Sequence, residues 1–384
     1  MNQKIFERKT LGPLLTLKKG KKPISQSPTK EKGMQPYVDI KAFETGVIDN
    51  YTDDDKCVPC NEGDLLIVCD GSRSGYVGRA IKGYTGSTLA KISAEGVDNS
   101  YLYYFIQSMY RLLNTQMKGT GTPHLNVEVL RKAELVIPSI SEQKRIVDKI
   151  EELFSELDSA VETLKKTKEQ LAVYRQSVLK EAFTQFTHKE KIKDHSEFVT
   201  SGSRGWAQYY SDEGARFVRI TDLTRDRIVL KNDDIQYVAL PDNVEGKRSR
   251  LKANDILVSI TADLGSIALI PEDIQEAYIN QHIALVRLSN PEIAKFTALY
   301  LKSDWGQKDL LKNKRGGGKM GLGLDDIRNT PIPVVSTDIA NKIVSQIESR
   351  LSACENIEKT VNNALIQADA MRQSILKKAF EGGL

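Results

Sequence analysis

Four short stretches of the chain place lysine or arginine beside glycine, hydroxyl and aromatic residues. They are Lys18–Lys22, Ser72–Tyr76, Ser201–Trp206 and Lys247–Arg250. Lysine and arginine neutralise phosphates, arginine can form two hydrogen bonds with a guanine edge, and glycine lets backbone amides approach a phosphate. These residue types together predict contacts with a nucleic acid. An ordinary solvated basic loop stays open as the alternative for any single cluster, and the prediction rests on their recurrence in both halves.

Two glycine-rich loops carry related chemistry. Residues 118–124 read Lys-Gly-Thr-Gly-Thr-Pro-His, and residues 315–320 read Arg-Gly-Gly-Gly-Lys-Met. We expect His124 to contact DNA rather than to act in catalysis. The residues predicted to contact DNA are Lys19, Lys21, Lys22, Ser72, Arg73, Ser74, Tyr76, Lys118, Thr120, Thr122, His124, Ser201, Ser203, Arg204, Trp206, Arg225, Lys314, Arg315 and Lys319.

The sequence predicts no catalytic site. A DNA adenine methyltransferase needs an Asn/Asp-Pro-Pro-aromatic tetrapeptide to hold the flipped base, and the chain has none. A nucleotide-binding loop of the form Gly-x4-Gly-Lys-Ser/Thr is also missing, because Lys319 is followed by Met320 and the spacing differs. We therefore expect no cofactor.

Two further motifs have a structural interpretation. Glu142-Gln143-Lys144 has the Glu-x-Lys form of many metal-dependent nucleases, but Ser139 and Glu142 have the spacing of a helix capping box. Cys57 and Cys60 form a lone Cys-x2-Cys pair with no second pair at zinc spacing. We expect neither a nuclease centre nor a metal site.

A long amphipathic helix must position these candidates. Between Arg145 and Phe183, ten positions recur in alternating steps of four and three, which is a heptad pattern. They are Ile146, Ile150, Leu153, Leu157, Ala160, Leu164, Thr167, Leu171, Tyr174 and Val178. At about 1.5 Å per residue the helix is roughly 60 Å long, and it needs a partner along its apolar side.

The partner helix is predicted in the same chain, at an offset of 197 residues. Arg145-Ile146-Val147 corresponds to Lys342-Ile343-Val344, and the end Arg175–Phe183 corresponds to Arg372–Phe380. The second seam reads Ile343, Ile347, Arg350, Cys354, Ile357, Val361, Ala364, Ala368, Met371 and Ile375. The repeat predicts two copies of one unit, each a globular segment followed by a long helix.

The globular segments repeat more loosely. Both contain short β-rich runs broken by glycine, proline and aspartate. Gly20 corresponds to Gly202, Tyr37–Ile40 to Phe217–Ile220, and Gly63–Val68 to Asn254–Ser259. These segments match between the two copies, whereas the sequences that connect them do not. This pattern suggests two similar scaffolds that present different surfaces to different ligands.

Composition sets wide limits. The chain has 384 residues, enough for two domains and an extended element, and a net charge of +4, a weak hint of an acidic partner. Its four cysteines predict free thiols. No apolar run has membrane length and the N-terminus does not resemble a signal peptide, so we expect a cytoplasmic protein without a membrane partner.

These features resemble the specificity subunits of type I DNA restriction-modification systems. The resemblance covers nearly the whole chain. It rests on the start of the first helix, Glu142–Val147, on the two helix ends at Arg175 and Arg372, and on the loop Gly119–Leu125. In the second copy, Thr337–Asn341 replaces the Glu-Gln dipeptide and adds two residues.

The resemblance implies an α+β fold with two similar target-recognition domains, each followed by a long helix, and with the two helices packed as an antiparallel coiled coil within the chain. It implies a non-catalytic subunit whose domains each read one half of a split, asymmetric sequence in double-stranded DNA. The helices would set the unread spacer and dock two modification subunits, which methylate adenine from S-adenosylmethionine. ATP-driven restriction subunits would join that core. Half-sites on one face of DNA lie about 34 to 36 Å apart per turn, a distance that such a helix can hold.

We predict target-recognition domains over residues 1–138 and 185–333, and helices over 139–184 and 334–384. The main alternative is a structural interaction protein whose heptads pair between chains and whose basic loops are incidental. A nuclease with its own active site is a third possibility. Sedimentation of the isolated chain separates the first two, since an intermolecular coil would give a concentration-dependent dimer.

Overall fold

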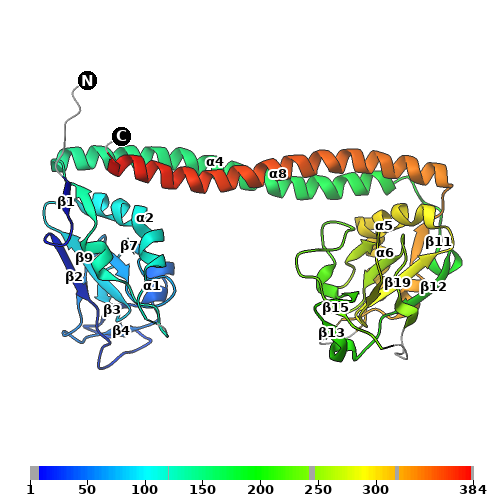
Figure 1. Ribbon diagram of the computed structural model, residues 1–384, viewed down its shortest axis with the longest axis horizontal. Coiled ribbons are helices and arrows are strands. Elements are labelled where there is room, and N and C mark those ends of the chain that lie inside the picture. Colours follow the sequence, from blue (N-terminus) through cyan, green and yellow to red (C-terminus); the bar gives the residue numbers. More distant parts are fainter. Residues whose placement is uncertain (1–7, 120, 242–246, 316–319, 382–384) are drawn as a thin grey trace, which may run out of the picture. The chain divides into compact units, whose positions relative to one another are not determined.

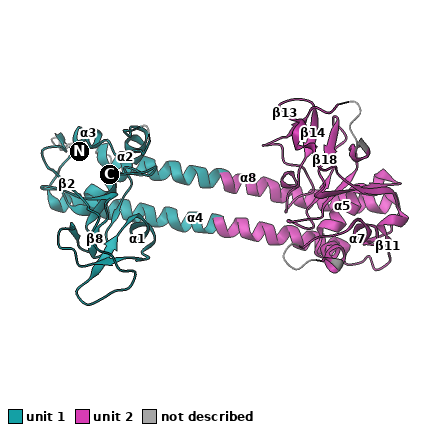
Figure 2. Ribbon diagram, turned by 90° about the horizontal axis from the view of Figure 1, so that it is seen from below, with its two compact units in different colours: residues 1–164, 363–384 teal, residues 165–362 magenta. Residues whose placement is uncertain are grey.

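The computed structural model describes residues 8–119, 121–241, 247–315 and 320–381 (Figure 1). The chain divides into two compact units (Figure 2). Unit 1 contains residues 1–164 and 363–384, and unit 2 contains residues 165–362. Each unit has a globular α+β part and a segment of each of the two long helices, α4 (Ile140–Phe183) and α8 (Thr337–Glu381).

The globular part of unit 1 has two four-stranded sheets and a two-stranded one. Their orders are β2-β9-β6-β7, β4-β3-β8-β5 and β1-β10. The elements are β1 (Arg8–Thr10), β2 (Leu15–Lys19), β3 (Gln35–Val38), α1 (Ile40–Thr45), β4 (Tyr51–Thr52), β5 (Pro59–Cys60), β6 (Leu65–Val68), β7 (Val77–Arg79), β8 (Gly83–Thr85), β9 (Leu89–Ala94), α2 (Asn99–Thr115), α3 (Val127–Arg131) and β10 (Glu134–Val136).

The globular part of unit 2 has three sheets of the same sizes, in the orders β12-β19-β16-β17, β13-β15-β14-β18 and β11-β20. Its strands are β11 (Lys189–Lys191), β12 (Ser196–Ser201), β13 (Tyr210–Ser211), β14 (Ala215–Val218), β15 (Tyr237–Val238), β16 (Ile256–Ser259), β17 (Ile267–Leu269), β18 (Ala277–Ile279), β19 (Ile283–Leu288) and β20 (Pro331–Pro333). Its helices are α5 (Ala294–Lys302), α6 (Asp304–Leu310) and α7 (Leu324–Arg328), with short 3-10 turns such as η4 (Lys247–Ser249).

The strand pairings confirm the predicted duplication. In unit 1, β3 runs parallel to β8 with Tyr37 opposite Tyr84. In unit 2, β14 runs parallel to β18 with Phe217 opposite Tyr278. The antiparallel sheets β2-β9-β6-β7 and β12-β19-β16-β17 have the same order, and β1-β10 and β11-β20 close each copy in the same way.

Glycine occurs at the corresponding positions 20 and 202 for the same structural reason. A Cβ atom at Gly20 would lie 2.1 Å from the carbonyl oxygen of Gly86, and one at Gly202 would lie 2.0 Å from that of Ile279. The backbone after β2 and β12 therefore passes too close to a neighbouring segment for any side chain. These glycines serve close packing of the chain, whereas the sequence had suggested close approach to a phosphate.

The two long helices pair antiparallel within each unit. In unit 2, Lys168 donates a hydrogen bond to Asn362 at 3.1 Å, Arg175 pairs with Glu358 at 2.7 Å, and Arg350 pairs with Glu181 at 2.9 Å. Residue numbers rise along one helix as they fall along the other. In unit 1, Arg372 pairs with Asp158. The predicted antiparallel pair is thus confirmed.

The start of α4 is held by its Glu-Gln dipeptide. The Ser139 hydroxyl accepts a hydrogen bond from the Glu142 amide at 3.4 Å, as expected of a cap. The buried amide of Gln143 accepts from the Asp98 amide at 2.7 Å and donates to the carbonyls of Gly96 and Pro138. This network joins α4 to the start of α2, which supports the structural interpretation of Glu142-Gln143-Lys144.

The heptad seam is partly wrong in its assignment. Tyr174, Ile357 and Met371 are 42%, 47% and 54% exposed. Their neighbours Arg175, Glu358 and Arg372 are less exposed and form ion pairs between the two helices. Other predicted seam residues, among them Leu171, Cys354, Val361 and Ala368, are buried as expected. At these three places the contact between the helices is therefore made by the residue after the predicted one. Ion pairs occupy positions for which apolar residues were expected.

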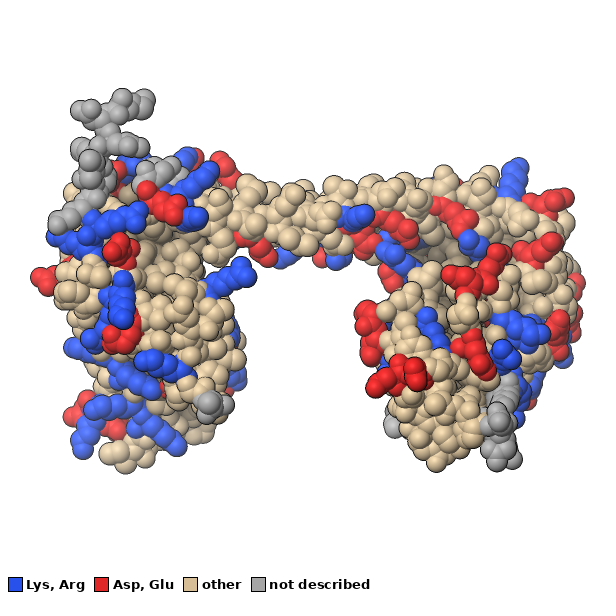
Figure 3. All heavy atoms as spheres, in the orientation of Figure 1, with Lys and Arg blue, Asp and Glu red and all other residues tan. Residues whose placement is uncertain are grey.

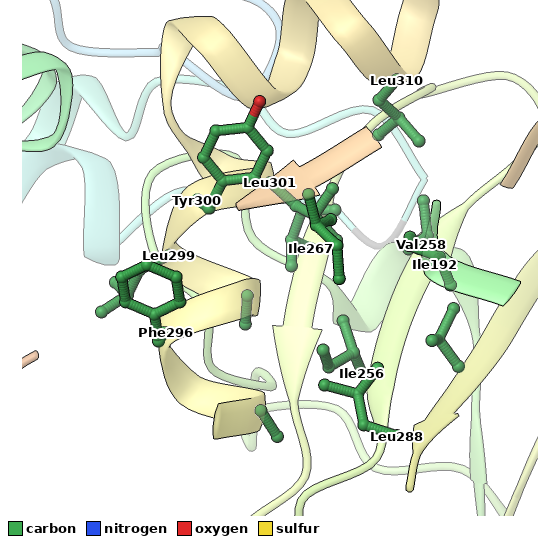
Figure 4. Close-up of a cluster of buried hydrophobic side chains, with 14 of the residues drawn as sticks. Ile192, Ile256, Val258, Ile267, Leu288, Phe296, Leu299, Tyr300, Leu301 and Leu310 are labelled. Carbon is green, nitrogen blue, oxygen red and sulfur yellow. The ribbon is translucent and has the colours of Figure 1, made fainter. Parts of the chain in front are cut away.

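The aromatic residue at each helix end belongs to a domain core. Phe183 of α4 contacts Phe296 and Tyr300 of α5, with ring centroids 5.2 and 5.4 Å apart. Phe380 of α8 contacts Tyr101 and Phe105 of α2, at 5.1 and 5.4 Å. This explains why the end motif Arg-Gln-Ser-x-Leu-Lys-x-Ala-Phe occurs twice. Figure 4 shows the core of unit 2, in which α5 packs over β16 and β17.

Candidate nucleic-acid interface

Asp70 contacts two predicted contact residues of unit 1, and a third is bonded to one of them. Its carboxylate lies 2.9 Å from Nζ of Lys19 and 2.7 Å from Nδ1 of His124. Asp70 and His124 also form a β-bridge, and Lys118 and His124 exchange backbone hydrogen bonds of 2.9 and 2.7 Å. The structure therefore places the end of β2, the segment after β6 and the loop 118–124 at one site.

Asp70 acts as the anchor of this site. Partial burial alone would raise its pKa, but hydrogen bonds and charge from Lys19 and His124 outweigh burial and lower the pKa of Asp70 below its usual value. The ionised carboxylate holds both side chains, and Lys19 and His124 stay about half exposed. The sequence predictions missed Asp70, whose only signal was its place directly after a buried strand.

A second group in unit 1 surrounds Tyr76. Its ring packs edge-on against Phe43 and Tyr110, and the guanidinium of Arg73 lies 4.4 Å from the ring centroid and pairs with Glu44. Ser74 is buried, and its hydroxyl donates to backbone carbonyls, among them that of Gly71 at 2.8 Å. Ser74 thus holds the loop, and Arg73 is the group presented to solvent.

The remaining candidates of unit 1 lie on exposed loops. Lys21, Lys22, Ser72 and Thr122 are exposed. Thr120 lies outside the described residues. On the face drawn in Figure 3, lysine and arginine side chains run along much of unit 1, whereas acidic and basic residues are intermixed on unit 2.

In unit 2 the segment Ser201–Trp206 turns above an aromatic group. Trp206 is buried, with its ring 5.2 Å from Tyr278 and 5.7 Å from Phe217. Gly205 adopts a φ of 77°, which favours glycine at the turn. Trp206 anchors the segment, and the exposed Arg204 beside it is available to a ligand. Ser201 ends β12 and Ser203 forms a bridge with Asn280.

Unit 2 repeats the anchored loop of unit 1 with different side chains. The bridges Thr261 to Gly321 and Arg315 to Gly321 correspond to Asp70 to His124 and Lys118 to His124. At these places Thr261 Oγ1 lies 2.7 Å from Nδ1 of His282, and Arg315, 80% exposed, pairs with Asp326 at 3.1 Å. The backbone framework is the same, but the acid and the histidine of unit 1 are replaced by threonine and glycine. Thr261 and His282 were not predicted, because only the fold brings them to the loop.

Three candidates of unit 2 remain. Arg225 pairs with Asp263, and its carbonyl accepts a hydrogen bond from Lys302. Lys314 is exposed directly before Arg315. Lys319 lies outside the described residues, as do Gly316, Gly317 and Gly318.

The cysteines of unit 1 are not arranged for chemistry of their own. Cys57 and Cys60 are buried free thiols, and burial raises the pKa of both. Within the described ranges, no group of three or more histidine, cysteine, aspartate or glutamate residues is placed to hold a metal ion. No described helix is both long and apolar enough to span a membrane.

Known proteins share both sequence and fold with this chain. The chain is 27% identical to the specificity subunit of the type I restriction enzyme EcoBI of Escherichia coli, over 84% of this chain and 73% of that protein. It is 24% identical to the MjaVIII specificity subunit of Methanocaldococcus jannaschii, over 97% and 91%. In fold it resembles a chain from a structure of a type I R-M system, with a TM-score of 0.74, 17% identity and coverage of 99% and 98%. A crystal structure of the HsdS subunit from Thermoanaerobacter tengcongensis gives a TM-score of 0.54 at 16% identity, over 99% and 97%.

The family model described as "Type I restriction modification DNA specificity domain" matches residues 4–172 and 217–367, one match in each copy of the repeat. These two matches cover most of the chain. The chain therefore belongs to the type I restriction-modification DNA specificity domain family.

Proposed function

We propose that this chain is the DNA specificity subunit of a type I restriction-modification complex, and that each globular domain reads one half of an asymmetric bipartite target. The relatives named above are called specificity subunits, and two matched domains fit two half-sites. The observation that carries the proposal is the repeated loop framework with different chemistry. Asp70 and His124 in one copy correspond to Thr261 and Gly321 in the other.

A duplicated scaffold with unequal surfaces suits an asymmetric DNA sequence. Each copy anchors the ends of its loop by the same pair of bridges. Lys19 and His124 can donate to base edges or phosphates in one half-site, and Arg204 and Arg315 can do so in the other. The buried Ser74 and Trp206 would act by positioning their loops.

The helix pair would set the unread spacer and dock two methyltransferase subunits. In support, each unit contains one segment of each helix in antiparallel pairing, and each exposes apolar side chains on it, such as Val173 and Ile366. Restriction subunits would join through that methyltransferase core, and catalysis would lie on those other subunits. The domain limits 1–138 and 185–333 remain part of the proposal.

A map of methylated adenines in the genome of a host tests the proposal. The host expresses the methyltransferase subunit with or without this chain, and single-molecule sequencing reads the marks. A new motif of two short, unequal halves around a fixed gap is expected only when both proteins are present. No new mark from a soluble, associated pair of proteins would contradict the proposal and favour the interaction-scaffold alternative.

A further inference from the structure

Unit 2 has a cationic hollow beside β12, and two of the residues that line it, Arg248 and Arg250, belong to the basic stretch Lys247–Arg250. The hollow is open to solvent, with a volume of about 670 Å³, and it is lined by Phe198, Arg248, Arg250, Leu251, Lys252 and Arg287. Four of these six side chains are basic and none is acidic. The strand that forms one wall, β12, ends at Ser201, where the candidate segment Ser201–Trp206 begins.

Arg287 is fixed in the floor of the hollow. Its Nε lies 2.7 Å from one oxygen of Asp255 and its Nη2 lies 2.6 Å from the other, which is a bidentate pair. The guanidinium carbon lies 4.7 Å from the ring centroid of Phe198. The side chain of Asp255 is 1% exposed, so this carboxylate is covered by Arg287 and does not face the hollow.

The other cations are available at the rim. Nε of Arg248 donates to the hydroxyl of Thr200 at 3.3 Å, which places Arg248 next to the end of β12. Within the described ranges, no hydrogen bond or ion pair engages the side chain of Arg250 or of Lys252. The backbone of Arg250 forms a bridge with Tyr278, the residue that packs on Trp206. The hollow therefore adjoins the candidate DNA-contacting segment on two sides.

The duplicated fold supplies an internal control for these charges. The pairing of Pro59 with Tyr84 in unit 1 corresponds to that of Arg250 with Tyr278, and the pairing of Thr16 with Ser93 corresponds to that of Phe198 with Arg287. The positions that match Phe198, Arg248, Arg250, Lys252 and Arg287 hold Thr16, Cys57, Pro59, Asn61 and Ser93. Unit 1 forms the same sheets without a charge at these five places, and there Asp64, the counterpart of Asp255, pairs with Lys91. The fold therefore does not require Arg248, Arg250 or Lys252.

We propose that this hollow binds a backbone phosphate of the DNA half-site read by the second domain. The inference rests on the proposed function and deepens it. A phosphate between Arg250 and Lys252 would meet the two unengaged cations and the fixed guanidinium, while Phe198 would contact the adjacent sugar. The contact would position the second domain on DNA without reading a base, and the first domain has no counterpart of it.

The test is the salt dependence of DNA binding by the full chain assembled with its methyltransferase subunit. The double variant Arg250→Gln with Lys252→Gln is compared with the wild type and with Lys308→Gln, an exposed lysine elsewhere in unit 2. The duplex carries the motif found in the methylation map. Each lost phosphate contact lowers the slope of log affinity against log salt by about 0.9, so we expect a fall of about one, with binding about tenfold weaker near 0.1 M salt. Lys308→Gln should leave the slope unchanged, and the methylated motif should be the same for all three proteins.

A methylphosphonate scan locates the phosphate. In this scan one backbone linkage at a time is made neutral. A linkage in one half-site should weaken the wild type about tenfold and leave the double variant unaffected. An unchanged slope in the double variant, with sequence-specific binding intact, would overturn the phosphate contact while the proposed function stands. Weaker binding of inorganic phosphate, with DNA binding unchanged, would assign the hollow to a free anion and also overturn the inference. Absence of specific binding by the wild type would overturn both proposals.

Discussion

Nη2 of Arg175 on α4 lies 2.7 Å from Oε2 of Glu358 on α8, and the two side chains are only 10% and 18% exposed. Arg227, from the globular part of unit 2, approaches the same oxygen to 3.1 Å. One carboxylate thus joins both helices and the second domain. The two arginines outweigh its partial burial and lower the pKa of Glu358.

Removing Arg175 should destabilise the helix pair of unit 2. We expect Arg175→Met to lower the free energy of unfolding by about 1 to 3 kcal/mol, because it leaves Glu358 partly buried with one partner. The double variant Arg175→Met with Glu358→Met should recover much of the loss. Urea unfolding measures both. If the double variant loses as much free energy of unfolding as the two single variants combined, Arg175 and Glu358 are not energetically coupled and the prediction is wrong.

This pair also shows where sequence reasoning ends. Apolar spacing predicted both helices, their pairing and the duplication, because burial of an apolar stripe leaves a period in the sequence. It selected Tyr174 and Ile357 over Arg175 and Glu358, because a buried ion pair has no apolar signal. The anchors Asp70 and Thr261 were missed for a different reason, since strand pairing between distant segments brings them to the loops.

Gly20 and Gly202 should respond alike to substitution. We expect Gly20→Ala and Gly202→Ala each to cost about 2 to 4 kcal/mol, because a Cβ atom would overlap a backbone carbonyl in either unit. Gly121→Ala is the matched control, since nothing lies within 4 Å of a Cβ atom there. Chemical unfolding gives the values. Tolerance of alanine at either position would refute the packing explanation for the repeated glycine.

Lys302 should be a destabilising residue at neutral pH. It is 6% exposed, and burial, helped by the nearby Arg225, lowers its pKa to about 8 against the opposing charges of Asp226 and Asp263. Below pH 8 the folded chain must hold a buried charge. Between pH 8 and about 10.5 the unfolded chain binds the extra proton, so stability from this group rises with pH.

We therefore expect Lys302→Met to stabilise the protein by about 1 to 3 kcal/mol at pH 7, with the gain shrinking toward pH 10. Lys308→Met, at an exposed position, should change little. Urea unfolding at pH 7 and pH 10 tests the pair of variants. A loss of stability at pH 7, or a gain that does not depend on pH, would contradict the prediction.

Asp70 should contribute stability above its pKa only. Because its pKa is lowered in the folded chain, its contribution is present above about pH 4 and is lost as the pH falls through the folded value. Asp70→Asn should therefore cost about 0.5 to 1 kcal/mol at pH 7, a small value since Lys19 and His124 are half exposed. The difference from wild type should shrink as the pH falls below about 4 and vanish once the pH lies below the folded pKa. Urea unfolding at several pH values measures this difference in stability. If the difference does not change with pH, the ionised carboxylate of Asp70 is not its source.

Loop variants show whether each domain reads its own half of the target, because the methylated motifs that they produce can be compared half by half. His124→Ala in unit 1 and Arg204→Ala in unit 2 are each expressed with the methyltransferase subunit, and methylated adenines are mapped by single-molecule sequencing. We expect each variant to relax or alter one half of the motif, the affected half to differ between the two variants, and the gap to keep its length. Changes in the same half, or in both halves together, would contradict it.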